Sequence, residues 1–70
     1  MTNTQRLEEL IQENGLKKKY IARQMGISPY SLTRKIRNES EFTSGQIDLF
    51  CDILNITSPK QKCEIFLVKK

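Results

Sequence analysis

Positively charged side chains are concentrated in one short stretch of this chain. Between positions 17 and 37 there are seven lysines and arginines and no acidic residue. The other positions hold five basic and all eight acidic residues, so they carry −3 against +7 for the stretch, and the whole chain carries +4. Separated charge of this kind favours contact with a polyanion. The basic residues concerned are Lys17, Lys18, Lys19, Arg23, Arg34, Lys35 and Arg37.

The residue types give little support for catalysis, cofactor binding or metal binding. The chain has no histidine, no serine or cysteine with a plausible base, no glycine-rich phosphate loop and no cluster of metal ligands. We therefore expect no enzyme, no cofactor and no metal site. Cys51 and Cys63 could pair, but Cys51 falls on an expected buried helix face and no secretion signal is present, which favours two reduced thiols.

Helical spacing of apolar residues predicts an all-α fold of five helices in a single domain, residues 1–70. The first helix is expected over about 4–14, with Thr2, Asn3 or Thr4 as its N-cap and its glutamates facing water. The second is expected over about 18–25. The others are expected to run from Pro29 to near position 38, from position 44 to about 55, and from position 59 toward 66.

Start signals support the last three of these helices. Serine followed by proline at 28–29 and again at 58–59 places a capping hydroxyl before a residue suited to the first helical position. Thr43 and Gln46 have the spacing of a capping box, and Phe42 and Ile47 that of a hydrophobic staple. No apolar run approaches the ~20 residues that cross a bilayer. We therefore expect a cytoplasmic protein without membrane contact.

Within the basic stretch, five residues have the spacing of a helix-turn-helix, over about 17–37. Ala22 is small enough for a second helix to cross closely, and Gly26 suits a sharp turn. Ile27 fills the space behind the turn, Ser28 can begin the second helix, and Leu32 can hold that helix against the first. Together these positions predict two helices at a steep angle, one of which could enter a groove.

On these residues, and on the expected helices before and after them, the chain resembles the lambda-repressor-like, Cro-type family of phage and bacterial transcriptional regulators. The resemblance extends from Leu7 to about Ile56, and the segment 38–43 is particularly similar to small phage-encoded repressors of Gram-positive hosts. In that family the second helix of the motif lies in the DNA major groove and homodimers bind two half-sites. The resemblance therefore implies a phage or prophage repressor that binds pseudo-palindromic operator DNA in the bacterial cytoplasm, associated with the nucleoid.

The resemblance also implies roles for individual residues. Pro29, Tyr30 and Arg34 match positions that contact base edges, and Thr33 lies beside them. Arginine can form two parallel hydrogen bonds to guanine. Proline replaces a commonly polar residue at position 29, and lysines replace the frequent Thr-Gln start of the family's second helix, which favours binding through phosphates. The expected phosphate contacts are Lys17, Lys18, Lys19, Ser28, Ser31, Arg37 and Asn38.

Two questions stay open at this level. Phe66, Leu67 and Val68 could fold into the core, or residues 58–70 could join the fourth helix in a homodimer interface; we favour the homodimer, and a monomer remains an alternative. The second question concerns function. The acidic first and fourth helices with these apolar residues could instead form the surface of a protein-interaction modulator, an anti-repressor-like protein with weak or unspecific DNA binding. Antitoxin-like or excision-control roles fall within the DNA-binding class.

Overall fold

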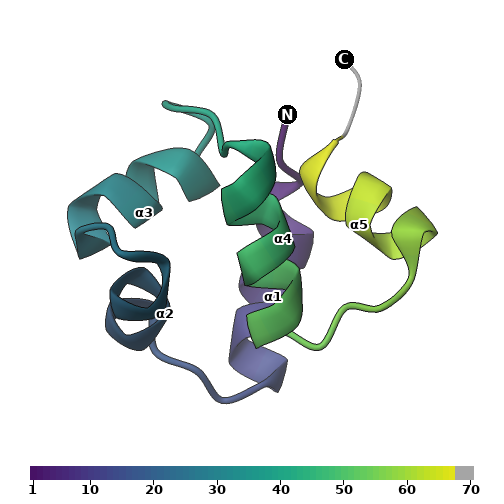
Figure 1. The fold of residues 1–70 in the computed structure, drawn as a ribbon, viewed down its shortest axis with the longest axis horizontal. Coiled ribbons are helices and arrows are strands. Elements are labelled where there is room, and N and C mark those ends of the chain that lie inside the picture. The colour runs from purple at the N-terminus through teal and green to yellow at the C-terminus, as the bar shows by residue number, and fades with distance from the viewer. Residues whose placement is uncertain (68–70) are drawn as a thin grey trace.

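The computed structural model describes residues 1–67, which form five α-helices and no β-strand (Figure 1). Their number, order and positions confirm the expected all-α fold. None of these helices has the length and apolar character needed to cross a membrane. In chain order they are α1 (Thr4–Glu13), α2 (Lys18–Met25), α3 (Pro29–Ile36), α4 (Ser44–Ile53) and α5 (Pro59–Phe66).

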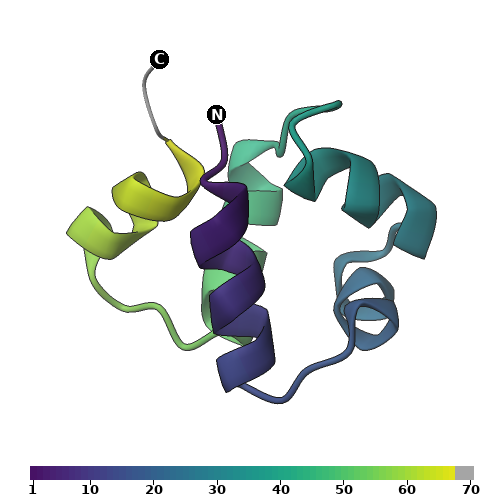
Figure 2. The same cartoon turned by 180° about the vertical axis from the view of Figure 1, so that it is seen from behind.

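Two helices stand at the centre of the molecule and three flank them. α4 lies in front of α1 in Figure 1, and α1 lies in front when the molecule is turned around in Figure 2. The pair α2 and α3 occupies one side, where α2 packs against both α3 and α4. α5 occupies the other side and packs against α1. The basic stretch therefore forms its own flank, far from the last helix.

A single apolar core joins the five helices. Every helix contributes at least one fully buried side chain, so removing any helix would expose apolar surface on the others. The stripes expected from helical spacing in α1, α2, α3 and α4 are all buried. The largest fully buried side chains are Leu7, Ile21, Leu32, Ile36, Phe50 and Ile65.

Three phenylalanines meet where α4, α5 and the loop before α4 converge. The ring centroids of Phe42, Phe50 and Phe66 lie 5.5 to 5.7 Å apart, and both pairs that involve Phe42 are edge-to-face. Phe66 is only 3% exposed, so it belongs to the core and is not available as an interface residue. Leu67 is 50% exposed, and Val68 lies outside the described residues.

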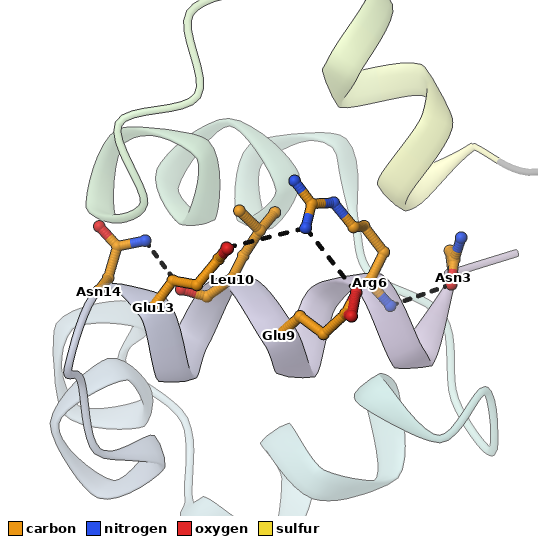
Figure 3. Close-up of polar contacts among 6 residues, drawn as sticks. All are labelled: Asn3, Arg6, Glu9, Leu10, Glu13 and Asn14. Atoms are coloured by element: carbon orange, nitrogen blue, oxygen red, sulfur yellow. Dashed lines mark hydrogen bonds and ion pairs between the residues drawn. The ribbon is translucent and has the colours of Figure 1, made fainter.

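Side-chain caps fix the start of four helices. Each capping oxygen accepts a hydrogen bond from the backbone N–H three residues further on, which is worth about 1 kcal/mol. Of the three candidates for α1, Asn3 is the cap (Figure 3), and the Thr43–Gln46 capping box of α4 is confirmed. α2 differs, because the Lys17 side chain makes no capping hydrogen bond. The four caps are Asn3, Ser28, Thr43 and Ser58.

Both cysteines are free thiols, as the sequence suggested. Cys51 lies on the inner face of α4 and is 5% exposed, whereas Cys63 is exposed on α5. Burial raises the pKa of the Cys51 thiol, and the nearby Lys62 ammonium opposes this effect. Cys51 therefore stays protonated at neutral pH and acts as a small apolar core residue.

The turn after α2 is a position where glycine is required. Gly26 has φ +70°, and a Cβ added there would meet no atom within 4 Å, so strain in the backbone alone opposes alanine. We expect Gly26→Ala to lower the free energy of unfolding by about 1 kcal/mol. Gly45 lies in α4 without positive φ and with the same open space, so Gly45→Ala should raise it by about 0.5 kcal/mol.

Urea denaturation followed by helical circular dichroism measures both variants. The two substitutions add the same methyl group, so opposite signs isolate the contribution of the left-handed backbone. If both variants lose stability to the same extent, the turn geometry described for Gly26 is wrong.

Candidate nucleic-acid interface

The turn between α2 and α3 holds these helices in the expected helix-turn-helix arrangement. Gly26 and Ile27 donate backbone hydrogen bonds to the last turn of α2, from which the chain turns toward α3. Ala22 is fully buried, and Leu32 holds α3 against the core. One face of α3 is thereby buried, and its other face is left to solvent (Figure 1).

The outer face of α3 carries all four residues expected to contact bases. Pro29 and Arg34 are exposed, Tyr30 is 73% exposed, and Thr33 is half-buried. The Arg34 guanidinium carbon lies 6.0 Å from the centroid of the Tyr30 ring. Thr33 Oγ1 donates a hydrogen bond to the carbonyl of Pro29 at 3.0 Å, so this hydroxyl is left as an acceptor. The four side chains offer apolar surface, a hydroxyl oxygen and a guanidinium group on one helix.

At the N-terminus of α3, two serines share a hydrogen-bond network. Ser28 Oγ accepts from the backbone N–H of Ser31 at 3.1 Å and donates to Ser31 Oγ at 3.1 Å. This leaves the hydroxyl proton of Ser31 free to be donated outward. A helix N-terminus also attracts anions through its backbone N–H groups. Phosphate contacts of Ser28 and Ser31 stay a prediction.

The three lysines at the start of α2 do not share one environment. Lys17 and Lys19 are exposed and, within residues 1–67, make no ion pair with an acidic side chain. Lys18 is half-buried, and its Nζ donates a hydrogen bond to Glu8 Oε2 at 2.9 Å. Two of the expected phosphate anchors thus present unpaired charge, and the third is held by α1. On α2, Tyr20 is also 48% exposed.

Glu8 contacts the basic stretch, which the sequence interpretation did not predict. The sequence predicts that it faces water, but it is half-buried and reaches from α1 to the first turn of α2. The local pattern contains one indication: Glu8 lies beside Leu7 and three residues before Ile11, at the edge of the buried stripe. This position in the sequence does not indicate that Lys18 is the partner of Glu8.

Beyond the end of α3, the two expected phosphate contacts also differ. Arg37 is exposed. The Asn38 side chain already has partners within the chain, because its Oδ1 accepts from Thr2 N at 2.8 Å and its Nδ2 donates to Thr2 O at 2.9 Å, and its contact with phosphate stays a prediction. Asn38 has φ +64°, the left-handed geometry expected where α3 ends. Its carboxamide therefore fixes the N-terminal segment beside α3.

Lys35 points away from the outer face of α3. Its Nζ donates a hydrogen bond to the carbonyl of Glu41 at 2.8 Å and lies 6.0 Å from the centroid of the Phe42 ring. This lysine stabilises the loop between α3 and α4. The charge left outward on the helix-turn-helix and at its end comes from Lys17, Lys19, Arg23, Arg34 and Arg37.

This arrangement is suited to binding double-stranded DNA. A solvent-facing helix presents one arginine and one hydroxyl oxygen, the groups that read base edges, and exposed cations and a helix N-terminus flank it, the groups that bind phosphates. Within residues 1–67 no group of three or more side chains could hold a metal ion.

Comparison with known protein families agrees with this geometry. The model of the Cro/C1-type HTH DNA-binding domain matches residues 6–61, from the first helix to the beginning of the last. No curated protein and no solved structure matches the chain. Because the family model covers most of the chain and includes the whole helix-turn-helix, this protein belongs to the Cro/C1-type helix-turn-helix DNA-binding family.

Proposed function

We propose that this DNA-binding regulator is a sequence-specific repressor of phage or prophage origin. It binds operator DNA with α3 in the major groove. The observation that supports this most strongly is the outer face of α3, which carries Tyr30, Thr33 and Arg34. The stretch from position 17 to 37 that contains this face has no acidic residue. Arg34 donates two hydrogen bonds to guanine O6 and N7 in this proposal, and Tyr30 and Pro29 cover a thymine methyl.

We propose two groups of phosphate contacts, which differ in their position on the helix-turn-helix. Lys17 and Lys19 at the start of α2, and Arg37 after α3, neutralise phosphates and set the dependence on salt. Ser28 and Ser31 contact a phosphate at the N-terminus of α3. Residues in these roles position the protein and carry no sequence preference of their own.

We further propose that two copies bind a pseudo-palindromic operator in the cytoplasm of a bacterial host. Support comes from two exposed apolar residues: Leu49 is 37% exposed on α4, and Leu67 is 50% exposed after α5. The alternative of a protein-interaction modulator has less support than it had from the sequence. Phe66 packs into the core, which removes one of the apolar residues on which that surface depends.

Selection of bound sequences from random duplex DNA at physiological salt tests the proposal. We expect one enriched motif that contains two inverted half-sites about 10 base pairs apart or a multiple of that spacing. A single enriched half-site would support sequence-specific binding by a monomer and contradict the dimer. Binding that enriches no motif and disappears at moderate salt would contradict the repressor.

A further inference from the structure

An ion pair connects the helix-turn-helix to α1. Lys18 Nζ lies 2.9 Å from Glu8 Oε2, and the two side chains are 40% and 42% exposed. The other carboxylate oxygen, Glu8 Oε1, is covered and finds no hydrogen-bond partner in the described part of the chain. Lys18 is therefore the cation that compensates this carboxylate, in a surface ion pair of which one carboxylate oxygen is covered.

The other ion pairs of residues 1–67 involve no residue of the basic stretch at positions 17 to 37. Arg6 lies 3.7 Å from both Glu9 and Glu13, so these acids are paired along the exposed side of α1 (Figure 3). A further pair joins α4 to α5. Among the seven cations at positions 17 to 37, Lys18 is the one that an acidic side chain neutralises.

We propose that Glu8 limits the affinity of this protein for DNA by masking Lys18. Sequence-independent binding depends on the number of phosphates that cations neutralise. A lysine that is already paired must either give up its carboxylate or bring it close to a phosphate, and both lower the gain on binding. Glu8 thus removes one cation from the phosphate-binding surface and reduces retention on non-operator DNA. The inference rests on the DNA-binding function proposed above.

Binding of a random-sequence duplex of about 20 base pairs tests this role without knowledge of the operator. We expect Glu8→Gln to bind this duplex about two- to fivefold more tightly than the matched control Glu9→Gln at the same salt concentration. Both variants remove one negative charge from α1, so the comparison cancels the effect of net charge. The slope of log affinity against log salt should become steeper by about 0.9 in Glu8→Gln, corresponding to one additional phosphate contact.

Substitution of Lys18, alone and together with Glu8→Gln, completes a double-mutant cycle. In the wild-type background, Lys18→Gln should weaken binding less than Lys19→Gln, because Lys18 is masked and Lys19 is not. In the Glu8→Gln background, Lys18→Gln should abolish the gain in affinity and restore the original salt slope. A pair that serves only to join α1 to α2 would change thermal stability and leave the salt slope unchanged, so melting curves are recorded for every variant.

Each result has a defined meaning. Equal affinities of Glu8→Gln and Glu9→Gln, or weaker binding by Glu8→Gln, would overturn the masking role and leave the proposed function intact. Failure of the wild-type protein to bind the duplex even at low salt would overturn both proposals. A gain in Glu8→Gln that persists when Lys18 is also replaced would show that the masked group is not Lys18.

Discussion

Replacing Phe50 by alanine is expected to remove about 3–5 kcal/mol from the free energy of unfolding. Phe50 is fully buried in α4, and its ring contacts those of Phe42 and Phe66, so the truncated side chain leaves a cavity between three segments. A domain of this length has roughly 4–10 kcal/mol of stability in total. The variant should therefore lose a large part of this stability, which circular dichroism measures as lower midpoints of urea and thermal denaturation.

Leu49→Ala provides the control for this measurement. Leu49 is the neighbouring residue in α4 and is 37% exposed, so we expect a loss of at most about 1 kcal/mol, measured at a protein concentration low enough to keep the proposed dimer contact of Leu49 from contributing. The comparison separates loss of core packing from any general effect of alanine in this helix. A similar loss of stability in the two variants would contradict the position of Phe50 at the centre of the core.

The second large effect concerns Arg34 and appears in DNA binding instead of stability. Arg34 is exposed on α3 and has no ion-pair partner within residues 1–67, so Arg34→Ala should leave the fold intact. Loss of two hydrogen bonds to guanine costs about 1–3 kcal/mol, which is about a 5- to 150-fold weaker affinity for the selected operator. Fluorescence anisotropy with labelled operator and random duplexes measures both affinities.

Two controls separate base recognition from charge. Arg34→Lys keeps the positive charge but loses the planar fork, so it should retain the affinity for random DNA and lose much of the preference for the operator. Lys19→Ala should weaken binding to operator and random duplex by similar factors, because phosphate contacts carry no sequence preference. If Arg34→Ala weakens both affinities equally, the role of Arg34 in base recognition is wrong.

Features that depend on neighbouring positions could be predicted from the sequence. The apolar stripes, the Thr43–Gln46 capping box and the left-handed turn at Gly26 each follow from residues fewer than five positions apart, and the structure confirms them. The same local reasoning places Pro29 and Tyr30 on the exposed side of α3. Helix geometry alone fixes these relations.

The parts that could not be predicted involve side chains that meet across the fold. Asn38 lies 36 positions from Thr2, and its carboxamide matches the backbone N–H and carbonyl of that residue only once the chain has folded. Glu8 and Lys18 meet around the turn between α1 and α2. Both Lys18 and Asn38 have residue types that suit phosphate binding, so composition and resemblance favour that role, while the tertiary contacts assign them partners within the chain.

The exposure of the two tyrosines gives this protein a built-in optical probe. The chain contains no tryptophan, and its two tyrosines lie in α2 and α3, where Tyr20 is 48% and Tyr30 is 73% exposed. Emission excited near 280 nm therefore originates from the helix-turn-helix alone, without background from the core phenylalanines. Stacking or burial of these rings against DNA alters that emission, so docking can be followed in the unlabelled protein.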